Sequence, residues 1–178
     1  MMKIVGIVFL ILILNACTAN EQNKTKTSTY FDVKGYFERE ASRLNGLNLK
    51  IDKSVEINSD VERKRVHIKD FKNELSTFIS ADINKSSWKG SFSVKKDPST
   101  ERYSTINEKI PVKMVEVHYQ NQKIRWIQIV SVTNNILYHS SDTLNYFPDS
   151  LYEIKKTQKI KLLNRKVYVV VGKLISSS

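Results

Sequence analysis

The chain of 178 residues contains only one cysteine, three prolines and five glycines. One cysteine excludes an internal disulfide and a structural zinc site of the cysteine-rich kind. The few glycines form neither a Gly-x-Gly-x-x-Gly sequence nor a Walker A sequence, so the usual phosphate-binding loops are missing. With 40% hydrophobic and 26% charged residues, the composition is that of an ordinary globular protein. It therefore excludes a collagen-like or wholly disordered chain.

The amino terminus has the pattern of a secretory signal peptide. Lys3 precedes the apolar run Ile4 to Leu14, and the small residue Ala16 follows it. Eleven helical residues at about 1.5 Å each extend for about 16 Å, which is too short for a hydrocarbon core of about 30 Å. We therefore expect residues 1–16 to be removed as a signal peptide and not to remain as a transmembrane anchor.

The segment Leu14-Asn15-Ala16-Cys17 resembles the lipobox of bacterial lipoproteins, although Asn15 replaces the small residue that is more frequent there. The resemblance implies that the Cys17 thiol carries a diacylglyceryl group, that cleavage separates Ala16 from Cys17, and that the new amino group is acylated. Each buried methylene contributes about 0.8 kcal/mol, so two or three acyl chains would form a lasting membrane anchor. The alternatives are a plain secreted protein with a buried cysteine, or an apolar N-terminal helix that stays attached.

The residues after Cys17 bear on which membrane holds the anchor. By analogy with other lipoproteins, Thr18 favours the outer membrane, because an aspartate at this position retains lipoproteins in the inner membrane of enteric bacteria. Export to the cell surface in Bacteroidota resembles a different rule, which needs a short acidic cluster, and residues 18–23 contain one acidic residue. We therefore expect a domain that faces the periplasm. The whole chain is similar in general style to small lipoproteins of Bacteroidota.

Residues 17–29 are expected to form a lipidated flexible tether and residues 30–178 a single domain. The segment 18–29 is polar and has no large apolar side chain, so it cannot bury enough surface to offset the entropy of ordering it. About 149 residues then remain, which is the usual size of a domain with one core.

Hydrophobic periodicity predicts two amphipathic helices, over 30–44 and 70–84. In each, large apolar side chains recur at spacings of three and four, which places them on one helix face. Gly46 is suited to a left-handed cap at the end of the first helix, and Asp70 to an N-cap at the start of the second.

Alternating apolar residues predict strands over 47–57 and near 61–68, joined by a turn. Beyond Trp88 the pattern indicates about six strands with short connections, which implies an antiparallel meander. Val167–Val171 is apolar apart from one tyrosine hydroxyl, so this strand is expected to be central and buried on both faces. The predicted fold class is α+β, with two amphipathic helices on a curved antiparallel sheet made of the N-terminal hairpin and this meander.

The residue types that carry most catalysis have no motif around them. His67, His118 and His139 lie in separate strand-like segments without metal-ligand spacing, and there is no Gly-x-Ser-x-Gly or Ser-x-x-Lys motif before a helix. The sequence therefore predicts no catalytic residue, no metal site and no cofactor. Carboxylate pairs could still meet in the fold, and the nearest candidates are Glu38, Glu40, Asp60 and Glu62.

Positive charge dominates the C-terminal part of a chain whose formal net charge is +11, or +10 once residues 1–16 are removed. In the strand predicted over 152–162, Lys155, Lys159 and Lys161 share one face, while Leu162 shares the other face with the apolar residues. The lysines could contact an anionic partner such as lipid headgroups, or they could protect an edge strand from aggregation. The run Arg63-Lys64-Arg65 has the same two interpretations.

These observations favour a membrane-anchored envelope lipoprotein with a non-catalytic binding or structural domain. Its expected partners are the membrane, through the N-terminal lipid, and another envelope protein or anionic lipid; nucleic acid is excluded as a partner outside the cytoplasm. The alternative is a periplasmic carrier of a lipid or other apolar ligand, which needs a cavity of several hundred Å3 with an apolar lining. A third candidate is a hydrolase, which needs histidine or carboxylate pairs within hydrogen-bond reach in a cleft.

Overall fold

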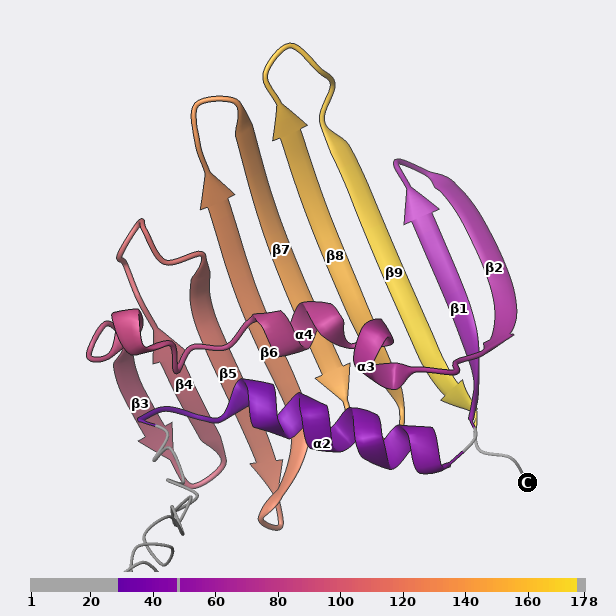
Figure 1. Cartoon of the computed structure of the whole chain (residues 1–178), viewed down its shortest axis with the longest axis horizontal. Helices are drawn as coiled ribbons and strands as arrows, with labels where there is room; N and C mark the ends of the chain where they lie inside the picture. Colours follow the sequence, from indigo (N-terminus) through magenta and orange to yellow (C-terminus); the bar gives the residue numbers. More distant parts are fainter. Residues whose placement is uncertain (1–28, 48, 176–178) are drawn as a thin grey trace, which may run out of the picture.

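The computed structural model describes residues 29–47 and 49–175. The fold is α+β, as predicted: one nine-stranded antiparallel sheet has its helices on one face (Figure 1). The predicted signal peptide, the cleavage site at Ala16 and Cys17, and most of the predicted tether lie outside the described residues.

The first predicted helix is confirmed as α2, Val33–Gly46. Asp32 caps it by accepting a hydrogen bond of 2.9 Å from the Gly35 amide, and the apolar residues at the predicted spacing are buried. Gly46 does not form the predicted left-handed cap. It is the last residue of the helix, and its φ angle lies outside the left-handed region.

The second predicted helix is broken into α3, Phe71–Glu74, and α4, Ser76–Ser80, followed by the 3-10 turn η2, Ser86–Trp88. Asp70 caps α3 as predicted, by accepting from two backbone amides. The break occurs at Leu75, whose backbone is not helical. In the segment between α4 and η2, the Asp82 side chain accepts a hydrogen bond from the Asn84 amide. Short polar side chains that bond nearby backbone groups compete with helix formation in this way.

The strands follow one another across the sheet in the order β2-β1-β9-β8-β7-β6-β5-β4-β3. Their bounds are β1 Lys50–Ile57, β2 Asp60–His67, β3 Ser93–Asp97, β4 Thr100–Ser104, β5 Val112–Gln120, β6 Lys123–Asn134, β7 Tyr138–Phe147, β8 Leu151–Ile160 and β9 Lys166–Ile175. The N-terminal hairpin is confirmed, and it extends the sheet beside β9. The meander has seven strands and not six, because the short β4 escaped prediction.

Large side chains fill the space between the helices and the sheet. Phe37 of α2 lies 4.8 Å from Phe78 of α4 and 5.2 Å from Tyr146 of β7, measured between ring centroids. The largest of the almost completely buried side chains include Phe37, Phe71, Phe78, Leu44, Ile51, Ile127, Tyr146 and Tyr152. The helices are therefore joined to the sheet by a packed core.

The last strand, β9, is interior, as predicted, since it lies between β1 and β8. Its segment Val167–Val171 is only half-buried, however, and not buried on both faces. The helices cross the sheet near one end, so the ends of β6 to β9 that carry the β6–β7 and β8–β9 connections extend beyond them (Figure 1).

Candidate functional site

Two hairpin turns project together from the end of the sheet that the helices leave uncovered. They are residues 135–137, between β6 and β7, and residues 161–165, between β8 and β9; we call them the paired tips. Because β7 and β8 are neighbours, Tyr138 pairs with Ile160, and the Lys161 amide donates a hydrogen bond of 2.9 Å to the Leu137 carbonyl. This contact joins the two turns, so they form one surface.

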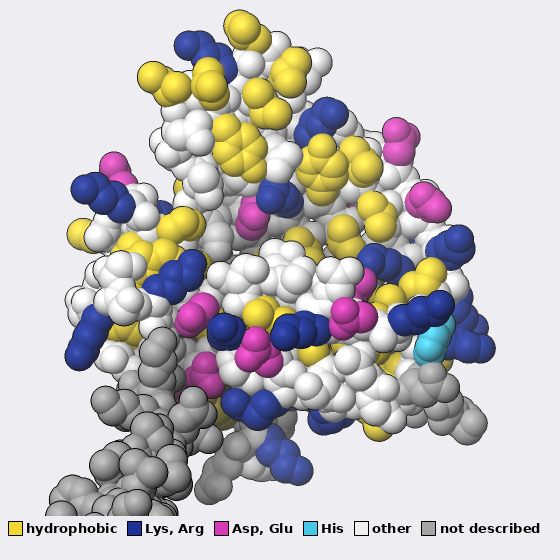
Figure 2. All heavy atoms as spheres, in the orientation of Figure 1, with side chains coloured by type: hydrophobic (Ala, Val, Ile, Leu, Met, Phe, Trp, Pro, Cys, Tyr) yellow, Lys and Arg dark blue, Asp and Glu magenta, His cyan; other side chains and the backbone are white. Residues whose placement is uncertain are grey.

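The paired tips expose apolar side chains to solvent. Half of the ten exposed large hydrophobic side chains of the described residues lie in the paired tips or, in the case of Ile160, at the end of β8 directly beside them: Ile136 (87% exposed), Leu137 (61%), Ile160 (42%), Leu162 (97%) and Leu163 (59%). Figure 2 shows hydrophobic side chains gathered at this end, beyond the helices, with lysine and arginine among them. Contiguous exposed apolar surface in a folded domain usually marks a site of interaction.

The backbone at Leu162 lies in the left-handed region, with φ of 70°. A branched side chain is unfavourable there, and such a conformation costs on the order of 1–3 kcal/mol. A glycine at this position would avoid that cost, whereas leucine places an apolar side chain at the apex of the turn. Strained positions of this kind are concentrated at functional surfaces.

Within the two hairpin segments that form the paired tips, the charged side chains have one sign. Residues 156–167 contain five cationic side chains and no acidic one, and residues 133–141 contain no acidic residue. Lys156 contacts Asp142 of β7 at 3.3 Å. The other four are not ion-paired with any described acidic side chain, and they lie in or directly beside the turn between β8 and β9: Lys159, Lys161, Arg165 and Lys166.

Only two of the three lysines predicted to share one strand face do so in the structure. Lys155 and Lys159 lie on the sheet face opposite the helices, whereas Lys161 follows the end of β8 and belongs to the paired tips. Edge protection is the wrong explanation for these lysines, because β8 lies between β7 and β9. It fits Arg63-Lys64-Arg65 instead, since β2 is an edge strand and Arg65 pairs with Asp52 of β1 at 2.7 Å.

A second polar cluster lies far from the paired tips, on the sheet face opposite the helices. His118 Nε2 is 2.6 Å from a Glu116 carboxylate oxygen, and the Arg102 guanidinium donates to the other oxygen of Glu116. Thr100 Oγ1 is 3.4 Å from His118 Nδ1, and the Trp126 ring stacks on the imidazole with 4.3 Å between centroids. Sequence reasoning missed this cluster, because only the register of β4, β5 and β6 brings its members together.

The hydroxyl, imidazole and carboxylate occur in the order found in nucleophilic relays, but the surroundings do not support catalysis. The Thr100–His118 distance is long for a hydrogen bond, and Thr100, Glu116 and His118 line none of the five main pockets of the described residues. A hydrolase needs a cleft that holds a substrate against the nucleophile. The cluster is better explained as a cross-strand network that stabilises the sheet.

Acid is expected to weaken this network. Burial raises the pKa of the Glu116 carboxyl, but its hydrogen bonds with Arg102 and His118 outweigh burial and hold that pKa below its ordinary value of 4.5. A carboxyl of this kind stabilises the fold above its unfolded-state pKa, and the contribution is lost as the pH falls through the folded-state pKa. We therefore expect the melting temperature to decrease as the pH is lowered below 4.5. The fall should be smaller in Glu116→Gln than in the exposed control Glu108→Gln, and parallel curves for these two variants would contradict the assignment.

The other sequence-predicted candidates do not assemble into a site. His67, His118 and His139 lie on β2, β5 and β7, which are not neighbours, and no group of three metal-binding side chains occurs among the described residues. Glu40 of α2 is buried, and it accepts hydrogen bonds from Arg43 and from Tyr146. The remaining predicted carboxylates are Glu38 on α2 and Asp60 and Glu62 on β2.

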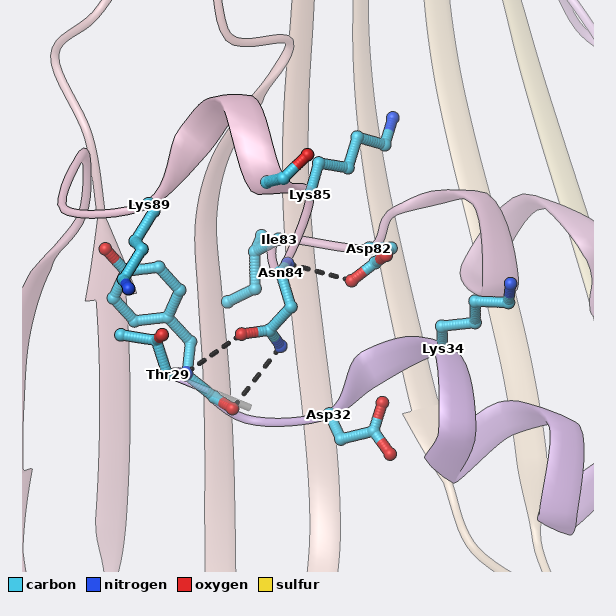
Figure 3. Close-up of a pocket in the computed structure, with 10 residues that line it drawn as sticks. Thr29, Asp32, Lys34, Asp82, Ile83, Asn84, Lys85 and Lys89 are labelled. Atoms are coloured by element: carbon cyan, nitrogen blue, oxygen red, sulfur yellow. Dashed lines mark hydrogen bonds between the residues drawn. The ribbon is translucent and has the colours of Figure 1, made fainter. Parts of the chain in front are cut away.

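The largest polar hollow beside the helices does not suit an apolar ligand. This pocket of about 470 Å3 is lined mostly by charged and amide side chains from the start of α2 and from the α4–η2 segment (Figure 3). Within it the Asn84 side chain accepts from the Tyr30 amide at 3.0 Å and donates to the Phe31 carbonyl at 3.0 Å. Asn84 therefore fixes the position at which the chain enters the fold.

The carrier alternative receives no support from these cavities. A second pocket, of about 540 Å3, is lined chiefly by charged residues of β1, β2 and β9. Between the helices and the sheet the described residues form a packed core, where a carrier would need an apolar cavity.

Across residues 29–47 and 49–175, none of the helices combines the length and apolar character needed to cross a bilayer.

Comparisons of the chain with protein-family models, with curated proteins and with solved structures gave no significant match.

Proposed function

We propose that the protein is a membrane-anchored lipoprotein of the bacterial cell envelope, and that its domain has a non-catalytic binding role. The observation that carries the anchor is the position of the only cysteine, Cys17, directly after Leu14-Asn15-Ala16 and the apolar run. In this proposal the chain begins at acylated Cys17 after cleavage. The lipid holds it on the outer membrane with the domain in the periplasm.

The binding role is supported by the paired tips. Together with Ile160 beside them, they expose five large apolar side chains, with four cations in or beside the β8–β9 turn. An exposed apolar surface of this kind is costly for a soluble domain unless a partner covers it. The partner is another envelope component, either a protein or anionic lipid.

The point where the chain enters the domain is separate from the paired tips. The first described residue, Thr29, lies beside the Asn84 contact, at the level of the helices and on the β3 side of the sheet (Figures 1 and 3). The chain that leads to Cys17 therefore leaves the domain apart from the exposed apolar surface. This arrangement supports a domain held by its lipid and free to present its tips.

The proposed anchor is tested by replacing Cys17 with serine in the natural host. Cells grown with an alkyne-tagged fatty acid should label the wild-type protein, and Cys17→Ser should lose the label completely, because the thiol that accepts the diacylglyceryl group is gone. Mass spectrometry of the wild-type protein should find a mature chain that starts at acylated Cys17. The fatty-acid label is the readout, since an uncleaved signal peptide could still hold the variant on a membrane.

A matched control is Asn15→Ala, which restores the small residue more frequent at that position and should keep the label. Labelled Cys17→Ser, or an unlabelled wild-type protein, would refute the anchor. The location is tested separately by adding protease to intact cells. The proposed periplasmic domain should be cleaved only after the outer membrane is permeabilised.

A further inference from the structure

We propose that the paired tips dock on the anionic surface of the membrane that carries the lipid anchor, so that the domain has a second membrane contact. This inference rests on the proposed function, since it takes the protein to be tethered at a membrane. It goes beyond that function by naming the surface that binds and the chemistry of its partner.

The first step is the arrangement of apolar and charged groups. The apolar side chains lie at the apex of the two turns, and Leu162 is 97% exposed. In the β8–β9 turn, the cations Lys159, Lys161, Arg165 and Lys166 flank the apolar residues on both sides along the chain. Side chains that enter the acyl region of a bilayer need such an apolar apex, and long cationic side chains beside it can reach the headgroups.

The second step is the sign of the charge. Residues 133–141 and 156–167 contain no acidic side chain, and among their cations only Lys156 pairs with an acid, Asp142, which lies outside both segments. The two segments are therefore complementary to an anionic surface. Each cation near such a surface changes the binding constant by about fivefold. A protein partner would more often match such a surface with acidic residues at fixed places, whereas a membrane requires no particular spacing.

The third step is that the tips act as a unit. The Lys161–Leu137 hydrogen bond of 2.9 Å joins the turns, and the Gln158 side chain donates to the Tyr138 hydroxyl at 2.9 Å just below them. In the β6–β7 turn, the Asn135 side chain accepts from the Leu137 and Tyr138 amides. A preformed surface loses less entropy on binding than a flexible loop would.

The chain between Cys17 and the domain is long enough for the paired tips to reach the membrane. Strand β7 has 10 residues and spans about 34 Å, which sets the scale of the distance between the two ends of the sheet. The residues between Cys17 and Thr29 can span at most about 40 Å. A chain of this length allows the tips to touch the same membrane that holds the acylated cysteine.

The test uses residues 18–178, which include every described helix and strand and the whole described core, and which contain no cysteine. This chain should co-sediment with vesicles of phosphatidylcholine and phosphatidylglycerol. It should not co-sediment with vesicles of phosphatidylcholine alone, and rising salt should weaken binding. A chain that binds neither vesicle, or both equally, would overturn the proposal.

Two tip variants separate the apolar and the ionic contributions. The apolar variant replaces Ile136, Leu137, Leu162 and Leu163 by serine, and it should weaken binding by more than about tenfold because these side chains no longer enter the bilayer. The ionic variant combines Lys161→Gln, Arg165→Gln and Lys166→Gln. At about fivefold per charge, it should weaken binding by about 100-fold.

Matched controls lie outside the paired tips. Ile106→Ser removes a fully exposed apolar side chain from the β4–β5 connection, and the triple variant Lys34→Gln, Lys85→Gln and Lys89→Gln removes the same charge as the ionic variant from the region beside the helices. Both controls should bind like the wild-type chain, and circular dichroism should show that all variants are folded. Equal losses in the charge control and the ionic variant would overturn the proposal, since net charge alone would then explain binding.

Insertion is measured directly by a fluorophore on a single introduced cysteine. Leu162→Cys should show a blue shift on anionic vesicles, and Ile106→Cys should show none. If the wild-type chain instead forms a dimer that the apolar variant abolishes, and no shift appears at residue 162, the surface binds a second copy and the proposal fails. None of these readouts depends on acylation of Cys17. A negative result with vesicles would therefore overturn membrane docking by the paired tips but not the proposed lipid anchor, and a missing acyl group on Cys17 would not change the vesicle result.

Discussion

Replacing Phe37 with alanine is expected to destabilise the fold by about 3–5 kcal/mol. The Phe37 side chain is completely buried, and it contacts α4 through Phe78 and the sheet through Tyr146. No neighbouring group can fill the space of a lost ring, so the variant loses both the burial and the contacts around the cavity. Domains have a total stability of about 5–15 kcal/mol, so this single change removes a large part of it.

The measurement is urea unfolding of residues 18–178, followed by circular dichroism. Ile106→Ala, at a side chain that is fully exposed, is the control and should change the stability by less than about 0.5 kcal/mol. A loss below about 1 kcal/mol for Phe37→Ala would mean that α2 does not pack on the sheet through this ring. The paired tips depend on this core indirectly, because the core stabilises the sheet and the sheet holds the two turns side by side.

The elements that could be predicted from the sequence are those with long, regular hydrophobic patterns. The spacing of Val33, Phe37 and Leu44 predicted α2, and alternation predicted β1 and most of the meander. The strand β4 was missed because its five residues are mostly polar, and only Tyr103 among them is buried. The break between α3 and α4 was missed because the apolar spacing continues across Leu75, where the backbone does not.

The candidate site was harder to predict than the fold. Alternation placed Leu162 on the apolar face of a strand over 152–162, but β8 ends at Ile160 and leaves Leu162 in the turn. Whether an apolar residue at the end of a pattern is covered depends on where the helices lie across the sheet, which local sequence does not encode. The Glu116–His118 network likewise depends on the register of three strands.

The role of the lysines of β8 was also impossible to predict from local sequence. Their alternation on one face was correct for Lys155 and Lys159, but their meaning depended on whether β8 is an edge strand. The strand order makes β8 interior, which removes the protective explanation and leaves the cations near the tips without a structural role. The strand order, and not the composition, is therefore what supports the proposed anionic partner at this end of the sheet.

Replacing Gly172 with alanine is expected to destabilise the fold by about 3 kcal/mol, the upper part of the range for overpacked cores. A Cβ atom at Gly172 of β9 would overlap the ring and the hydroxyl group of Tyr152, the residue paired with it on β8. Tyr152 cannot move aside easily, because its side chain is 1% exposed and its hydroxyl donates to Glu74 of α3. The added methyl group must therefore displace the strand or the helix above it.

The control is Gly46→Ala, since a Cβ atom at Gly46 would contact nothing and this glycine is at the exposed end of α2. It should be neutral or slightly stabilising, because alanine is the better helix former. A double-mutant cycle with Tyr152→Leu isolates the clash: in the Tyr152→Leu background, Gly172→Ala should cost less than it does in the wild-type chain. An unchanged cost would show that the penalty comes from the backbone of β9 and not from the aromatic ring that lies over it.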